Sequence, residues 1–175
     1  MSAFLIREVN GRDAVSVSEI FRAAYGALAE AQKLSVRTRE HMYEENTPGK
    51  ILKRFAGNYF YIAEDKESHK IVGVIGLRKH GNASIHNRIS TFFVLPEYQS
   101  SGVGSLLFHT LLSVAEKIGV TTLVVRSSLY AEKIYAHWKF KRTRLLKQKY
   151  SNGDVYTTVW MEKVLSPKPS GKRDV

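Results

Sequence analysis

The stretch Val94-Leu-Pro-Glu-Tyr-Gln99-Ser-Ser-Gly102-Val-Gly104-Ser-Leu-Leu107 decides the fold of this chain. Residues 84–95 lead into it as a long strand, which Pro96 ends because proline cannot continue a central ladder. Residues 105–118 follow it with leucines at helical spacing. A strand that passes through a glycine turn into a helix presents backbone N–H groups and a positive helix end to an anion. The stretch is therefore a candidate site for a phosphate-bearing ligand.

The residues present exclude two other glycine-loop motifs. The phosphate loop of the nucleotide hydrolases requires Gly-Lys-Ser/Thr, which does not occur in this sequence. The dinucleotide fingerprint requires a third glycine near position 107, which is Leu107. Two glycines alone fit a plain strand-to-helix connection as well as they fit a ligand site.

Strands and helices are predicted on both sides of this stretch. A capping box formed by Ser16 and Glu19 begins the first helix, and Thr47-Pro48 begins the second. Residues 35–47, between these helices, are polar and carry no helical prediction. The expected strands are 4–9, 59–64, 70–78, 84–95, 120–125, 143–150 and 155–164, and the expected helices are 16–31, 48–55, 105–118 and 129–138. The pattern predicts an α/β domain over residues 1–165, with six to seven strands, about four helices and a disordered basic tail at 166–175.

The charge of this 175-residue chain is concentrated in one segment. The net charge is +11, and residues 133–149 hold seven basic side chains and no acidic one. The absence of cysteine excludes disulfides, thiolate metal sites and cysteine nucleophiles, and the six histidines show no metal-binding spacing, so no metal is expected. Because no long apolar run and no signal-like N-terminus is present, we expect a soluble, cytoplasmic protein without a membrane partner.

Two motifs resemble those of the GNAT superfamily of N-acetyltransferases. The pattern Gln99-x-x-Gly102-x-Gly104, preceded by Val94-x-Pro96-Glu97, is similar to the acetyl-CoA pyrophosphate loop of that family. Further on, Ser128-x-x-Ala131-x-x-x-Tyr135-x-x-x-Lys139-Phe140 resembles its later helix motif. The order of elements also resembles the family over residues 4–164. Lys139 departs from the glycine that usually closes the second motif, which leaves the turn after this helix open.

The resemblance implies a cofactor site between splayed central strands of a mostly antiparallel mixed sheet. Acetyl-CoA, as co-substrate, would lie against the backbone of the strand that ends near Val94, with its pyrophosphate at residues 100–105. The implied cofactor-binding residues are Phe92, Phe93, Val94, Gln99, Ser100, Ser101, Gly102, Val103, Gly104, Ser105, Ser128, Ala131 and Tyr135. The basic segment 133–149 would steer the CoA phosphates or form a solvated face, and both interpretations stand equally.

The implied reaction is direct transfer of an acetyl group from acetyl-CoA to a primary amine. Tyr135 matches the family's general acid, although a core-packing tyrosine is the alternative, and the N–H of Phe92 would stabilise the oxyanion. The positions where family members carry a basic glutamate hold Arg88 and Leu123. His86 is therefore the candidate base. The alternatives are His80, His41, Glu44 and a water chain.

The sequence leaves the acceptor and the class of protein open. Residues 35–50 would form part of the acceptor wall, where Tyr43, Glu44 and Glu45 suit a cationic amine and Arg37 and Arg39 suit a carboxylate. The acceptor would be an amine-bearing small molecule, a protein or a peptide. Two other functions are a non-catalytic acyl-CoA-binding module and a basic nucleic-acid-associated domain, although no nucleic-acid motif is present. An exposed edge strand at 155–164 would favour a homodimer.

Overall fold

A seven-stranded mixed sheet, in the order β1-β2-β3-β4-β5-β7-β6, organises the chain. The computed structural model describes residues 2–78 and 86–165, so the predicted tail at 166–175 lies outside the described residues. The strands are β1 (Phe4–Glu8), β2 (Tyr59–Asp65), β3 (Ile71–Arg78), β4 (His86–Val94), β5 (Thr122–Ser128), β6 (Lys141–Lys149) and β7 (Val155–Val164). The helices are α1 (Ala14–Ala31), α2 (Val36–Glu44), α3 (Pro48–Phe55), α4 (Val103–Lys117) and α5 (Glu132–His137). No helix in these two ranges is long and apolar enough to span a membrane.

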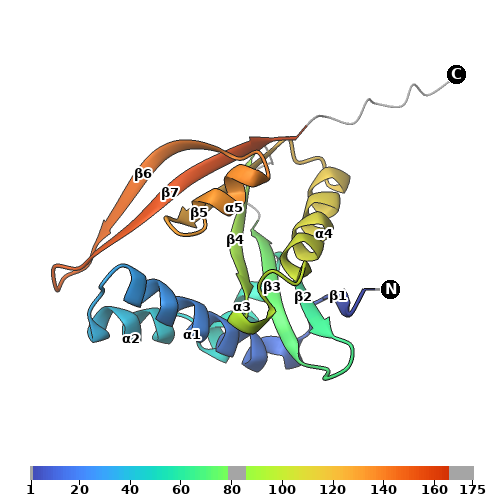
Figure 1. Ribbon diagram of the computed structural model, residues 1–175, viewed down its shortest axis with the longest axis horizontal. Helices are drawn as coiled ribbons and strands as arrows, with labels where there is room; N and C mark the ends of the chain where they lie inside the picture. The colour runs from blue at the N-terminus through green and yellow to red at the C-terminus, as the bar shows by residue number, and fades with distance from the viewer. Residues whose placement is uncertain (1, 79–85, 166–175) are drawn as a thin grey trace, which may run out of the picture.

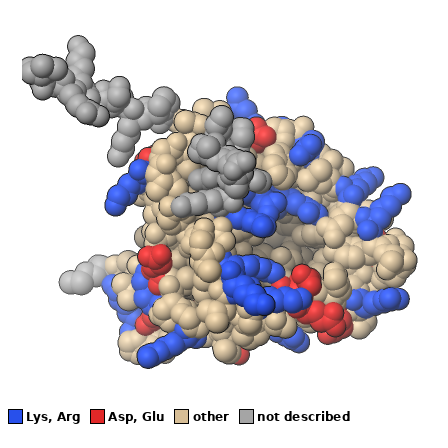
Figure 2. Space-filling view, turned by 180° about the vertical axis from the view of Figure 1, so that it is seen from behind, with Lys and Arg blue, Asp and Glu red and all other residues tan. Residues whose placement is uncertain are grey.

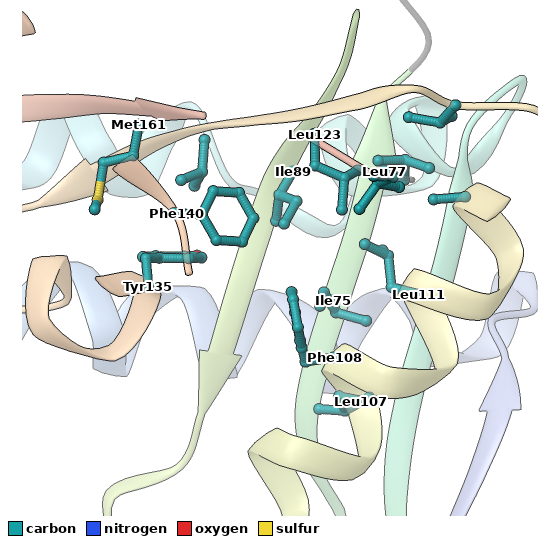
Figure 3. Packing of buried hydrophobic residues seen from close by; sticks show 14 of the residues in the cluster. Ile75, Leu77, Ile89, Leu107, Phe108, Leu111, Leu123, Tyr135, Phe140 and Met161 are labelled. Carbon is teal, nitrogen blue, oxygen red and sulfur yellow. The ribbon is translucent and has the colours of Figure 1, made fainter. Parts of the chain in front are cut away.

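Helices cover both faces of the sheet (Figure 1). Successive side chains of a strand point to opposite faces, so Ile62 packs with α1 and α3 whereas the neighbouring Ala63 packs with α4. On the α4 side, Leu107, Phe108 and Leu111 face the sheet (Figure 3). The two apolar clusters place β2 and β3 between two helical layers, and this sandwich confirms the predicted α/β class.

The helix α2 is an addition to the four predicted helices. Its residues lack an amphipathic pattern, which is why the sequence did not indicate it. Its first turn is capped by Ser35, whose Oγ accepts a hydrogen bond of 3.3 Å from the Thr38 N–H. Thr38 and Met42, one turn apart, are its buried residues. A cap and two tertiary contacts therefore specify this helix.

The predicted edge strand at 155–164 is not an edge. It forms β7, which lies between β5 and β6, so the structural basis for the predicted homodimer is absent. The edge on this side is β6, which carries five of the seven basic residues of segment 133–149. These are Lys141, Arg142, Arg144, Lys147 and Lys149, all exposed. A row of charged side chains on an edge strand disfavours pairing with another chain.

The turn after α5 keeps the conformation that glycine favours, although its residue is Lys139. The φ angle of Lys139 is +66°, in the left-handed region. The N–H of Lys139 bonds the carbonyl of Ala136 at 2.9 Å, and the N–H of Phe140 bonds that of Tyr135 at 3.0 Å. The departure from glycine at this position therefore leaves the helix end closed in the usual way.

Candidate active site

The parallel pair β4–β5 opens into a fork at the centre of the sheet. Their pairing runs from His86 opposite Thr122 to Ile89 opposite Val125 and stops there. Beyond that point β4 continues to Val94 against β3, while β5 continues to Ser128 against β7. A bulge opposite Gly76/Leu77 accompanies the opening. The predicted splay of the central strands is confirmed.

The main chain of β4 presents polar groups to this fork. The N–H of Leu95 bonds the carbonyl of Val72 on β3 at 2.9 Å. Backbone groups alternate in direction along an antiparallel strand, so Phe93 also faces β3, whereas the N–H and C=O groups of Phe92 and Val94 point to the other side. The carbonyl of Val94 meets Gln99 Nε2 at 3.4 Å. This open strand edge can bind an extended ligand through main-chain hydrogen bonds.

The glycine turn lies next to that strand edge. Gly102, with φ +86°, precedes α4, and the first helical bond joins the Leu106 N–H to the Gly102 carbonyl at 3.2 Å. The N–H groups of Val103, Gly104 and Ser105 precede it and have no intrahelical acceptor. A Cβ on Gly102 would meet no atom within 4 Å, whereas one on Gly104 would lie 3.7 Å from the Phe92 ring. The turn therefore offers free donors and open space, which fits a pyrophosphate.

The preceding residues hold the turn in shape. Ser100 adopts a φ of +64°, and the Ser101 hydroxyl donates to the carbonyl of Tyr98 at 2.6 Å. Both residues were predicted to bind the cofactor, and both are exposed at the turn.

Tyr135 lies beside Phe92 on the α4 side of the fork. The Ser128 hydroxyl accepts a bond of 3.1 Å from the Ala131 N–H and so shapes the entry to α5, which carries Tyr135. The Tyr135 and Phe92 rings are 6.3 Å apart in an edge-to-face arrangement. Burial raises the pKa of the Tyr135 phenol above its ordinary value. A protonated phenol therefore lies next to the predicted oxyanion donor.

Trp138 completes an aromatic cluster that the sequence reasoning missed. Its ring stacks on Phe108 at 4.1 Å and on Phe92 at 5.4 Å. It lies three residues after Tyr135 in the sequence, and this helical spacing could have predicted that both rings lie on the same face. The cluster holds Phe92 and Tyr135 in place between α4 and α5.

Other predicted site residues point away from the fork or lie outside the described part of the chain. The Phe93 ring packs on the opposite face, 5.2 Å from Phe21, so only its main chain is near the fork. The main chain of His86 begins β4, but its side chain, like all of His80, lies outside the described part of the chain. Leu123, at the second position where the family carries a glutamate, is fully buried.

A hollow of about 310 Å³ opens at the fork on the side of α1–α3. Its walls come from these helices, from the β6–β7 hairpin, from the middle of β4 and from β5, and Lys and Arg side chains gather around it (Figure 2). Of the predicted acceptor-wall residues, Glu45 lines it, and so does His41, one of the alternative bases. Arg37, Arg39, Tyr43 and Glu44 do not line it.

A larger hollow, of about 460 Å³, lies near β1 and the start of α1. Most of its charged side chains are paired: Arg7 bonds Asp13 at 2.9 Å and Glu64 at 3.1 Å. Lys70 likewise bonds Glu97 at 2.9 Å. Because this hollow lies away from the fork and most of its charges are paired, it is not the candidate active site.

Asp154 ties the β6–β7 hairpin to the start of α2. Its carboxylate accepts hydrogen bonds from the N–H and hydroxyl of Ser35, at 2.8 and 2.6 Å, and from the Thr38 hydroxyl at 2.5 Å. These bonds lower the pKa of Asp154 to about 2. The Gln32 side chain adds two bonds to the main chain of Thr157, at 3.0 and 2.8 Å, so one ionised group and neutral hydrogen bonds together hold the hairpin to the helices.

Replacing Asp154 by alanine is expected to lower the Tm at pH 7. A carboxyl group whose pKa is depressed by folding stabilises the protein above its unfolded value of about 3.9, and this contribution is lost as the pH falls towards 2. The Tm difference between the wild type and Asp154→Ala should therefore shrink between pH 4 and pH 2. Thermal unfolding over this pH range measures it, and a difference independent of pH would contradict the assignment.

The fold and the fork define the class of protein: an α/β protein with the architecture of CoA-dependent acyltransferases. The family model described as an acetyltransferase (GNAT) domain matches residues 27–165. The chain belongs to the GNAT acetyltransferase family, as its two motifs indicated.

Solved structures share the fold at low sequence identity. A GCN5-related N-acetyltransferase from Rhodopseudomonas palustris has a TM-score of 0.76 and 23% identity, with 94% of this chain and 98% of that chain covered. PaiA N-acetyltransferase from Thermoplasma acidophilum, solved with coenzyme A, has a TM-score of 0.72 and 17% identity, with 94% and 100% covered. YncA from Salmonella typhimurium, a putative acetyltransferase solved with acetyl-CoA, has a TM-score of 0.65 and 19% identity, with 97% of this chain and 98% of that chain covered. No curated protein matches the sequence.

Proposed function

We propose that this protein is an N-acetyltransferase that transfers the acetyl group of acetyl-CoA directly to a primary amine. The observation that carries the proposal is the position of Tyr135 beside Phe92, at the open edge of β4 and next to the Gly102 turn. Acetyl-CoA-bound and CoA-bound relatives of the same fold support the choice of donor. Without cysteine, the chain cannot form a thiol-linked acetyl intermediate.

The residues around the fork suit the two requirements of the reaction. Attack of the amine on the thioester carbonyl places negative charge on its oxygen, and the Phe92 N–H, which points into the fork, would stabilise that charge. The CoA thiolate then needs a proton. Tyr135 would supply it, because burial keeps its phenol protonated.

The amine must be neutral before it attacks, and we keep His86 as the proposed base. His41 is the alternative, since it lines the hollow with its ring 6.2 Å from that of Tyr150. Measuring kcat/KM against pH for His86→Ala and His41→Ala separates them. The base is the histidine whose replacement removes the acidic limb of the pH profile. If neither variant changes the profile, a group other than these two histidines is the base.

Release of CoA over a panel of amines tests the proposed function. The panel includes amino acids, polyamines, aminoglycosides and peptide N-termini, and turnover is expected with at least one class. Tight acetyl-CoA binding without turnover would favour the non-catalytic module instead. Nucleic-acid binding that falls steeply with salt and persists in Gly102→Val would favour the third function.

A further inference from the structure

Three arginines from three different elements line the hollow at the fork. They are Arg54 of α3, Arg88 of β4 and Arg126 of β5. The carboxylate on the same wall, Glu45, is bonded to Lys50 at 2.7 Å. The hollow therefore carries an excess of positive charge, and Figure 2 shows Lys and Arg side chains on both sides of it.

Neutral groups hold two of these arginines in place without cancelling their charge. Arg126 donates from Nε to the Thr158 hydroxyl and from a terminal nitrogen to Gln148 Oε1, both at 2.9 Å. Arg54 donates to Asn46 Oδ1 at 2.6 Å and to the carbonyl of Glu45. Among residues 2–78 and 86–165, none of the three arginines forms an ion pair with a carboxylate.

Arg88 has unused hydrogen-bonding capacity. Its side chain is half-buried, and its Nε is buried with no hydrogen-bond partner among the described residues. Burial, together with Arg78 and Arg126 nearby, lowers the pKa of this guanidinium from its ordinary value. A buried donor without an acceptor costs free energy, which an anionic ligand would recover.

Three tyrosines add neutral donors to the same wall. Burial raises the pKa values of Tyr25, Tyr150 and Tyr156, the last to about 12, so their hydroxyls stay protonated. Guanidinium groups and protonated phenols together suit the oxygens of an anion. A polycationic acceptor would need carboxylates here, and it would instead meet three unneutralised arginines.

We propose that the acceptor is a small amine that also carries an anionic group, a carboxylate or a phosphonate, and that Arg88 binds this group. The inference rests on the proposed function and adds the substrate class. Arg88 precedes Phe92 by four residues on β4, at most about 13 Å along the strand, so one small molecule can reach both. The hollow of about 310 Å³ has the size of a small-molecule site.

The test compares acceptors that differ only in the anionic group. Amino acids are assayed beside their neutral amides and beside aminoalkylphosphonates, with CoA release and equilibrium binding measured separately. Wild type is expected to prefer the anionic forms by about tenfold or more in kcat/KM. The more active of the two anions identifies which one the site takes. Preference for amides, polyamines or peptide N-termini would overturn the proposal.

The variant Arg88→Met removes the charge and keeps the length of an apolar side chain. It is expected to raise KM and Kd for the anionic acceptors by about tenfold or more, with little change for neutral amines. The matched control is Arg12→Met, which removes an exposed arginine just before α1 that does not line the hollow, and it should behave as wild type. Equal loss for anionic and neutral amines in Arg88→Met would contradict the proposal.

Binding separates a failure of this inference from a failure of the proposed function. If anionic amines bind in an Arg88-dependent way but no CoA is released, the catalytic proposal fails and the anion site stands. If CoA is released without any preference for an anionic group, the acetyltransferase stands and the anion site is wrong.

Discussion

The variant Tyr135→Phe is expected to lower kcat by about 100-fold or more while acetyl-CoA binds as before. General acid catalysis by a positioned side chain contributes about 10²- to 10⁴-fold, and only the hydroxyl is removed. The phenylalanine ring keeps the packing of Tyr135 against Phe92 and Phe140, at 6.3 and 5.4 Å, so the fold should be retained. Steady-state kinetics and calorimetric titration with acetyl-CoA measure the two effects.

The matched control is Tyr130→Phe, which removes a hydroxyl from an exposed tyrosine just before α5. It should retain wild-type kcat. If Tyr135→Phe also stays within about twofold of wild type, the tyrosine is a packing residue and another group protonates the thiolate.

The pH profile provides a second check on Tyr135. Because burial raises the pKa of its phenol, activity should not decline on the alkaline side below about pH 10, the ordinary tyrosine value. If the activity of the wild type declines near neutral pH and that of Tyr135→Phe does not, the pKa of the Tyr135 phenol is not raised.

The variant Gly102→Val is expected to weaken acetyl-CoA binding by about 100-fold, because it would lose charge-assisted hydrogen bonds at the turn. Gly102 has a φ of +86°, which a β-branched residue tolerates poorly. The space where its side chain would stand is open to the ligand. A valine there would fill the space beside the free N–H groups of α4. Calorimetry measures the affinity.

The control for strain is Gly119→Val at the other end of α4. Gly119 has a φ of +79° and equally open surroundings, so the substitution imposes a similar backbone cost away from the fork. Both variants should lose about 1–2 kcal/mol of stability, but only Gly102→Val should lose acetyl-CoA affinity. If the two variants bind acetyl-CoA with equal affinity, the Gly102 turn does not bind the cofactor.

Much of the fold was readable because it depends on local patterns. The first helix, the strand that Pro96 ends and the glycine turn each follow from residues close together in the chain. The predicted start of the helix was wrong, because the capping box is formed by Asn10 and Asp13 and Ser16 lies within α1. The two motifs around Gly102 and Tyr135 also identified the family. In contrast, α2 depends on burial of Thr38 and Met42, so no hydrophobic pattern in its own residues predicted a helix there.

The order of strands could not be read in the same way. The segment 155–164 resembled an edge strand, but β7 is inserted between β5 and β6, and pairing partners are chosen by contacts distant in sequence. The same insertion places five basic residues of segment 133–149 on the β6 edge. Its far end contributes Gln148 to the hollow at the fork, and Tyr150 follows it there, but no basic residue of segment 133–149 lines that hollow.

The sequence by itself determined the α/β class, the glycine turn and the family, because each is encoded by residues within a few positions of one another. Only the tertiary structure decided what lines the hollow at the fork. Arg54, Arg88 and Arg126 come from three elements far apart in the chain, and they meet because β4 and β5 separate beyond Ile89 and Val125. Three of the 27 Lys and Arg residues thus meet at the fork, beside the strand edge that we propose binds acetyl-CoA, although none of the three belongs to the basic segment 133–149.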